Sequence, residues 1–174
     1  VGVISMSMTE AIDRIRMAGE LGVRYFQISF PNWGAVSNEE ALIDSLLDGQ
    51  LENGGWSISS SSVDLDATAM VIQALAPYYE KREDVKTAVD SALTFLASVM
   101  TDDGQLRYGA NQPAVETVAQ VIVALCELGR DPAADELFTK NGKTLLDGLA
   151  SFFVETGFAH LEGSNFDQMA TEQS

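Results

Sequence analysis

The chain has 174 residues, of which 46% are hydrophobic and 8% aromatic, and this globular composition is sufficient for a sizeable core. Its 26 acidic and 10 basic residues give a net charge of −16. A field of that sign repels phosphate backbones and anionic lipid, so we expect neither nucleic-acid binding nor binding to a membrane surface.

The chain has one cysteine and one histidine, and this excludes two kinds of site. Cys126 cannot form a disulfide within the chain, and Cys126 and His160 together are too few for a zinc cluster. Because Cys126 lies in an apolar run, we expect it to be a small core residue. No apolar run in the sequence reaches the ~18 residues of a membrane span. The sequence therefore predicts no metal, no cofactor and no membrane insertion.

The first 36 residues carry two different signals. Ser7–Glu10 has a capping-box pattern, and the helical stripe behind it stops at Gly22. Val23–Phe30 is rich in β-branched and aromatic residues, which predicts a strand, although a short apolar run can also be helical in a helical context. We assign residues 1–36 to a separate segment, a helix plus a possible strand, which does not match the rest of the chain.

Two helices are predicted next. Ser37–Glu40 is a second capping box and predicts a helix that continues to Leu47. The stretch that follows, from Gln50 to Tyr79, reads QLENGGWSISSSSVDLDATAMVIQALAPYY. Its polar, glycine-rich turn leads into a helix that is apolar on nearly every side. Such a helix has to be buried all round, so neighbouring elements must cover it.

The same plan continues towards the C-terminus. In Asp84–Met100 the apolar residues recur at i, i+3 and i+4, which predicts a helix with one face in water. A polar loop then leads into residues 114–128, apolar nearly all round, and Gly129 ends that helix. Leu145–Val154 predicts another amphipathic helix, and a third polar loop precedes a new helix near Asp167.

These elements form a repeat of about 50 residues. A shift of 50 residues places Gly54 on Gly104, and a shift of 103 places Asp64 on Asp167. The alternation of two-faced and fully apolar helices predicts an all-α fold with two layers of helical hairpins in a partial ring. The predicted repeat region is 37–174, with units at about 37–80, 84–129 and 133–174.

The sequences of two stretches resemble those of a known superfamily. Gln50, Gly-Gly-Trp, an acidic loop and Ala-Thr-Ala before an apolar helix resemble the α/α-toroid superfamily of terpene cyclases such as squalene-hopene cyclase, protein prenyltransferases and transcobalamin-type carriers. The stretch from Gln50 to Tyr79 and the later stretch AVETVAQVIVALCELG look closest to prenyltransferase-like repeat regions of secreted or cell-wall-anchored proteins of Gram-positive bacteria. The resemblance covers roughly Ser37 to Ser174. The resemblance implies an α/α-toroid and an extracellular or cell-wall-associated location. A full ring of this kind has about six hairpins, so we expect this chain to be an arc of a longer protein.

An acidic motif opens the first apolar helix. Asp64-Leu65-Asp66-Ala67-Thr68 resembles the DxDDT motif with which cyclases protonate an alkene, but Ala67 replaces the third aspartate. Without that neighbour a strongly acidic carboxyl is difficult to build. The favoured alternative is that Asp66 caps the helix, worth ~1 kcal/mol, because Glu116 takes the same place in the second unit.

Several polar and aromatic residues are candidates for lining a ligand site at the loop end of the ring. They are Trp56, Asp64, Asp66, Tyr108, Asn111, Gln112 and Glu116. Trp56 is more simply explained by packing between hairpins, and the loop residues by solvation. His160 has no sequence neighbour that would make it an acid or base. Cys126, within an apolar helix, does not fit the zinc ligands of prenyltransferases.

These observations favour a non-catalytic ligand-binding or architectural module of an extracellular bacterial surface protein. A small hydrophobic or corrinoid ligand is the expected partner. Two alternatives stay open. One is a terpene or polyprenyl cyclase-like enzyme that uses Asp64 and Asp66, and the other is a protein–protein interaction module that forms a homodimer through exposed repeat edges.

Overall fold

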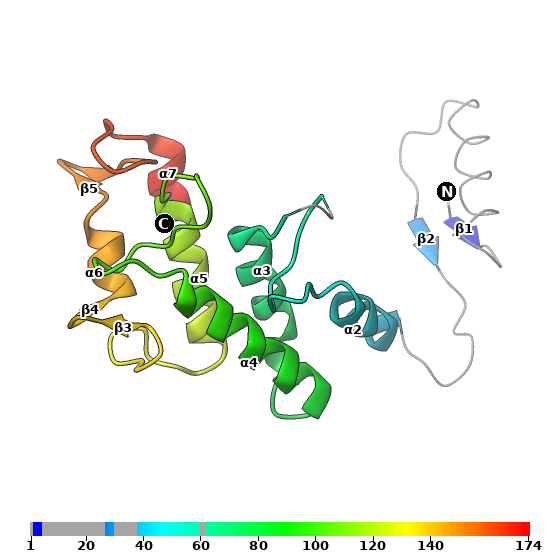
Figure 1. Ribbon diagram of the computed structural model, residues 1–174. Coiled ribbons are helices and arrows are strands. Elements are labelled where there is room, and N and C mark those ends of the chain that lie inside the picture. Colours follow the sequence, from blue (N-terminus) through cyan, green and yellow to red (C-terminus); the bar gives the residue numbers. More distant parts are fainter. Residues whose placement is uncertain (1, 5–26, 30–37, 60–61) are drawn as a thin grey trace. The chain divides into compact units, whose positions relative to one another are not determined.

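The computed structural model describes residues 2–4, 27–29, 38–59 and 62–174 (Figure 1). The chain divides into two compact units, Val1–Asp44 and Ser45–Ser174, and each is described by itself. The helix predicted behind Ser7–Glu10 lies outside the described residues, and so does most of the predicted strand Val23–Phe30.

The first unit contains a pair of strands. β1 (Gly2–Ile4) and β2 (Gln27–Ser29) pair in parallel, with Val3 opposite Ile28. β2 lies within the stretch that the sequence predicted as a strand. α2 (Asn38–Asp48) begins in this unit and matches the helix predicted behind the second capping box.

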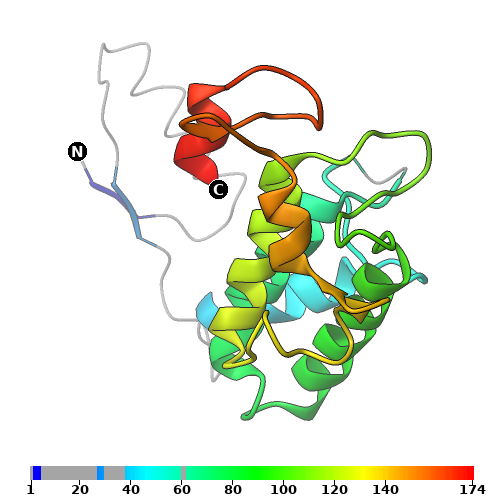
Figure 2. The same ribbon diagram turned by 90° about the vertical axis from the view of Figure 1, so that its left-hand side faces the viewer.

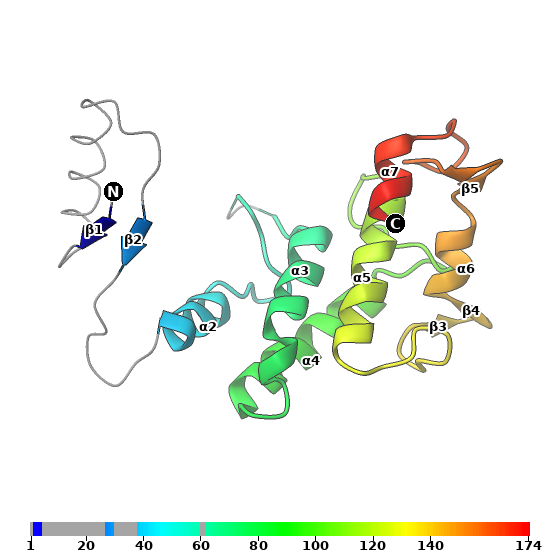
Figure 3. The same ribbon diagram turned by 180° about the vertical axis from the view of Figure 1, so that it is seen from behind.

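Helices dominate the second unit. They are α3 (Leu65–Leu75), the 3-10 turn η1 (Ala76–Tyr78), α4 (Glu83–Ser98), α5 (Val115–Glu127), α6 (Leu145–Ala150) and α7 (Gln168–Gln173). α3 and α5 lie side by side (Figure 3), and the side-chain amide of Gln73 donates to the side-chain oxygen of Gln120 at 2.9 Å. α4 packs against α3, whereas α6 and α7 pack against α5 (Figure 2).

The core of this unit is built from one face of each long helix. In α4 the buried positions follow the predicted spacing of i, i+3 and i+4, and the opposite face carries Lys86 and Asp90. α3 and α5 were expected to be buried all round, and this expectation is wrong for the described residues. Met70 on α3 is 59% exposed and Val123 on α5 is 44% exposed. Cys126 is also exposed, so it is not a core residue.

The prediction of an all-α fold made of two layers of helical hairpins is wrong, because short strand pairs accompany the helices and make the fold mixed α/β. Besides the β1–β2 pair, two antiparallel hairpins are present in the second unit. They are β3 (Thr139–Lys140) with β4 (Lys143–Thr144), and β5 (Phe153–Val154) with β6 (Gly157–Phe158). Asn141 and Gly142 connect β3 to β4 with φ angles of 52° and 77°, the conformation that a two-residue hairpin turn requires.

The β5–β6 hairpin also shortens a predicted helix. Leu145–Val154 was expected to be helical throughout, but α6 ends at Ala150. Phe153 instead pairs with Phe158 across the hairpin, and their rings meet edge to face at 5.6 Å. Cross-strand aromatic pairing therefore replaces the last turn of the helix.

α3 begins at a side-chain cap. The carboxylate of Asp64 accepts a hydrogen bond from the backbone N–H of Ala67 at 2.8 Å. The sequence assigned this role to Asp66, and that assignment is wrong, because Asp66 lies one residue inside the first turn. Asp167 caps α7 in the same way through the N–H of Ala170, at 2.9 Å.

A threonine ties each of these caps to the preceding loop. Thr68 Oγ1 accepts from the backbone N–H of Trp56 at 2.9 Å and donates to the Asp64 carbonyl at 2.6 Å. Thr171 makes the equivalent bonds to Phe158, at 2.8 Å, and to the Asp167 carbonyl, at 2.7 Å. The loops before α3 and α7 therefore share one hydrogen-bond framework.

The N-terminus of α6 gives a prediction about acid sensitivity. Lys143 donates to the Asp147 carboxylate, which also accepts from the N–H of Thr144, and these bonds lower the pKa of Asp147 from 3.8 to about 2. Since the pKa is depressed in the folded chain, the carboxylate stabilises the fold above about pH 4, and this contribution is lost as the pH falls towards 2. The pair is partly exposed, so we expect a small effect that salt weakens.

The comparison is between the wild type and Asp147→Asn in urea unfolding at several pH values. We expect the wild type to be the more stable protein at about pH 6, and the difference to shrink between about pH 4 and pH 2. A difference that stayed constant over this range would show that the charge of Asp147 does not stabilise the helix.

Candidate functional site

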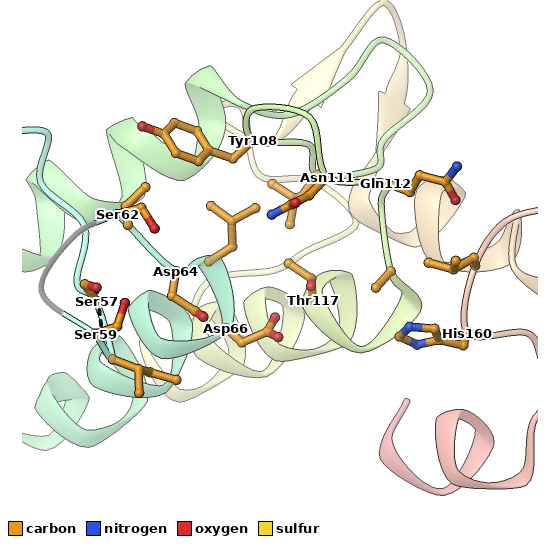
Figure 4. Close-up of a pocket in the computed structure, with 16 residues that line it drawn as sticks. Ser57, Ser59, Ser62, Asp64, Asp66, Tyr108, Asn111, Gln112, Thr117 and His160 are labelled. Carbon is orange, nitrogen blue, oxygen red and sulfur yellow. Dashed lines mark hydrogen bonds between the residues drawn. The ribbon is translucent and has the colours of Figure 1, made fainter.

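A pocket of about 350 Å³ opens where the loop before α3 meets the loop before α5 (Figure 4). Its volume lies in the range of small-molecule sites, ~300–1,000 Å³. The residues that line it lie in three segments of the second unit. They are Ser57–Ser59 with Ser62–Asp66, six residues between Leu106 and Thr117, and His160–Leu161.

Five of the seven residues predicted for a ligand site line this pocket. They are Asp64, Asp66, Tyr108, Asn111 and Gln112. The amide of Asn111 points into the pocket, whereas that of Gln112 points away from it (Figure 4). The structure therefore brings these predicted residues together from two loops that are distant in the sequence.

Trp56 does not line the pocket. Its side chain is only 4% exposed, and its ring N–H donates to the carbonyl of Leu46 at 2.6 Å. This environment fits the packing interpretation of Trp56 rather than a ligand wall.

Glu116 lies beside the pocket and contacts the third polar loop, which lies between β6 and α7. Nδ1 of His160 is 2.9 Å from each carboxylate oxygen of Glu116. Glu116 lines an adjoining hollow, which shares Asp66 and His160 with the pocket and also includes Asp167.

The third loop also supports the start of α5. Ala114, the residue before this helix, makes no side-chain cap. The carbonyl of His160 accepts from the N–H of Val115 at 3.1 Å, and Leu161 forms an isolated antiparallel bridge with Ala114. The sequence did not identify His160 as a site residue, because its contact with Glu116 spans 44 positions and leaves no local pattern.

Some polar side chains in the pocket have no hydrogen-bond partner within the described residues. Asp66 and Asn111 are exposed, as loop and helix-end polar groups often are. Thr117 is different, because it is only 8% exposed. A hydroxyl so deeply buried is normally hydrogen-bonded. No fully enclosed side-chain nitrogen or oxygen lacks a partner in the part of the chain that the structure describes, so the hydroxyl of Thr117 keeps some accessible surface, and the residue lines the pocket.

The charge of the lining restricts what the pocket can hold. Two aspartates line it, and its described lining includes no lysine or arginine. The whole chain adds a net charge of −16. An anionic ligand such as a diphosphate would therefore be repelled, while neutral or cationic ligands would not.

The geometry does not favour acid catalysis at Asp64 and Asp66. Asp64 is occupied as the cap of α3, and Asp66 is open to water. Protonation of an alkene needs a dry site and a carboxyl whose acidity its neighbours enhance. No group of three or more potential metal ligands occurs among the described residues. What the arrangement provides is a set of hydrogen-bonding groups around a pocket.

Sequence reasoning missed the role of Thr117, although a signal was present. Thr117 is a polar residue on the buried side of a helix that is otherwise apolar there. Thr68 is the comparable residue in α3, but its hydroxyl is bonded to the backbone. The contrast distinguishes a structural threonine from one that faces a pocket.

This contrast predicts opposite results for two identical substitutions. Thr68→Val leaves the buried N–H of Trp56 without its acceptor, so we expect a loss of ~1–3 kcal/mol in the free energy of unfolding. Thr117→Val removes a hydroxyl that has no partner in the described chain, so we expect no loss, or a small gain, in the free energy of unfolding. Urea unfolding of both variants gives the comparison, and equal losses would contradict the assignment of Thr117 to the pocket.

Comparison of the chain with protein-family models, with curated proteins and with solved structures gave no significant match. The resemblance to prenyltransferase-like repeats therefore stays a prediction. Among the described residues, no helix has both the length and the apolar character to cross a bilayer.

Proposed function

We propose that this chain is a non-catalytic binding module that holds a small ligand between the loops before α3 and α5. The observation that carries the proposal is Thr117, a residue that is only 8% exposed, lines the pocket and has a side-chain hydroxyl with no partner among the described residues. Asp66 and Asn111 add unpaired polar groups to the same pocket. Concave sites with a few convergent polar groups are typical of ligand binding.

The proposal places the module in an extracellular or cell-wall-associated bacterial protein. Its support is the resemblance of Ser37–Ser174 to prenyltransferase-like repeat regions of such proteins. The excess of acidic residues is compatible with this location and disfavours a partner that is itself an anion.

The polar lining favours a polar ligand over the small hydrophobic ligand that the resemblance suggests. An isoprenoid chain would cover Asp66, Asn111 and Thr117 without pairing them, at a cost of ~1–3 kcal/mol for each buried polar group. A corrinoid carries polar amide groups but is much larger than a single small pocket, and it would have to cover the pocket from outside.

The binding function is tested by amide NMR spectra of the 174-residue chain with and without a soluble mixture of small sugars, amines and carboxylic acids. Shift changes concentrated at the pocket residues would support the proposal. Changes spread evenly over the surface, or no changes, would overturn it.

A separate assay tests the non-catalytic part of the proposal. The chain is incubated with squalene and the extract is analysed by gas chromatography. We expect unchanged squalene. A cyclised product that disappears in Asp66→Asn would identify a catalytic acid and refute this part of the proposal.

A second candidate function is an interaction module that pairs with another copy of the chain. Met70 and Val123 favour it, because these apolar side chains are 59% and 44% exposed on the helices α3 and α5. Pairing through these helices would remove apolar surface from water. Sedimentation velocity should then show a concentration-dependent dimer that Met70→Glu weakens, and a monomer at every concentration would exclude the candidate.

A further inference from the structure

We infer that the ligand of this pocket is a neutral, polyhydroxylated ring, that is, a saccharide residue. The inference rests on the proposed binding function and adds the chemical class of the ligand. It depends on three properties of the lining: its charge, its balance of donors and acceptors, and its apolar surface.

The charge excludes one class directly. A carboxylate or phosphate would approach Asp66 as a like charge, and the described lining offers no lysine or arginine to compensate. His160, the remaining group in the lining that can become positive, is already in contact with Glu116. Anionic ligands are therefore disfavoured.

The balance of donors and acceptors separates the two classes that remain. Ser62, Thr117 and Tyr108 present hydroxyls, which both donate and accept, and the amide of Asn111 also does both. The carboxylate of Asp66 only accepts. A protonated amine only donates, so it would pair with Asp66 but offer no acceptor to the N–H groups of the Asn111 amide. A sugar hydroxyl donates and accepts, so vicinal hydroxyls can pair with every one of these groups.

The lining also provides an apolar surface for the C–H face of a sugar ring. Leu65 and Leu161, which are partly exposed, contribute aliphatic surface. The ring of Tyr108 is held by an edge-to-face contact with Phe95, with the centroids 5.5 Å apart. This contact fixes an aromatic side chain at the pocket before any ligand arrives, which lowers the entropic cost of binding.

Three variants test which side chains bind the ligand. Thr117→Val removes a hydroxyl that is unpaired in the described chain, so it changes the pocket without removing a protein contact. Thr94→Val is the control, because Thr94 is an exposed threonine on α4 that does not line the pocket and whose hydroxyl donates to the Asp90 carbonyl. Asp66→Asn keeps the shape of the side chain and removes its charge.

The experiment is an NMR titration of the chain with methyl β-glucoside, methyl α-mannoside and N-acetylglucosamine, with ethylamine and acetate as the charged probes. We expect at least one sugar to shift the pocket residues with a saturable curve. Thr117→Val should weaken that sugar about five- to tenfold, the usual effect of one neutral hydrogen bond, while Thr94→Val leaves it unchanged. Asp66→Asn should weaken it by a similar factor, because the amide still offers an acceptor. Thermal unfolding of each variant confirms that the fold is retained.

The outcomes distinguish the ligand class from the function. Saturable binding of ethylamine at the pocket, lost in Asp66→Asn and without any response to the sugars, would overturn the saccharide assignment and leave the binding function intact. Sugar binding that is equally strong in Thr117→Val and the wild type would place the sugar elsewhere and also overturn the assignment. If neither these probes nor the broader mixture of small molecules perturb the pocket, both the assignment and the binding function are wrong.

Discussion

Gly104→Ala is expected to lower the free energy of unfolding by more than ~3 kcal/mol. Gly104 has a φ of +92°, a region that residues with a side chain rarely adopt, and an added Cβ would overlap the carbonyl of Thr144. The overlapping atoms belong to the backbone at the start of α6, so no side-chain rotation relieves the clash. Urea unfolding of the variant measures the loss.

Two further glycines separate the causes of this effect. Gly109 also has a positive φ, +65°, but an added Cβ meets no atom within 4 Å, so Gly109→Ala should cost only ~1–2 kcal/mol of backbone strain. Gly148 contacts the carbonyl of Gly104 from the α6 side, so Gly148→Ala should reproduce the clash without the positive φ. Equal losses for Gly104→Ala and Gly109→Ala would show that α6 does not approach this loop so closely.

Trp56→Ala is the second large effect, with an expected loss of ~3–5 kcal/mol in the free energy of unfolding. The side chain is 4% exposed, and its ring N–H donates to the carbonyl of Leu46. Truncation would therefore leave a cavity and a backbone oxygen without its partner. The measurement is urea unfolding followed by circular dichroism.

Trp56→Phe is the matched control, because it keeps an aromatic ring and loses the N–H donor. We expect it to cost less than half as much as Trp56→Ala and to leave ligand binding at the pocket unchanged. A large loss of ligand affinity with little loss of stability would instead identify Trp56 as a wall of the binding site.

Local sequence signals predicted the elements whose structure depends on local interactions. The buried face of α4 follows its apolar spacing. Gly129 ends α5 as expected, with a φ of +71° and a hydrogen bond from the N–H of Arg130 to the carbonyl of Leu125. The hairpin at Asn141–Gly142 was not predicted from the sequence, although Asn-Gly is a strong signal for such a turn.

The expectation that α3 and α5 are buried all round was wrong because burial depends on contacts between distant parts of the chain. Apolar composition indicated that α3 and α5 would be covered on every side, but composition does not show how many neighbours a helix has. Met70 and Cys126 are exposed because the described residues do not cover those faces. Periodicity alone also could not reveal that Phe153 would pair with Phe158 instead of extending α6.

Local sequence patterns also identified only some of the residues of the candidate site. The sequence identified Asp66 as a candidate from its resemblance to an acidic cyclase motif and Asn111 from its place in a polar loop, and the structure brings both to one pocket. It did not identify Thr117, because burial without a hydrogen bond is visible only in three dimensions. His160 was set aside because its carboxylate neighbour is far away in the sequence.

The hydrogen bond between the N–H of Val115 and the carbonyl of His160 links detachment of the loop that carries His160 to opening of the first turn of α5. When the third loop detaches, the first turn of α5 loses an acceptor and the pocket loses one of its walls at the same moment. Occupancy of the pocket and attachment of the loop then belong to one cooperative equilibrium, so a bound ligand slows the opening. The hydrogen-exchange rate of a single amide, that of Val115, is therefore a reporter of how often the pocket comes apart.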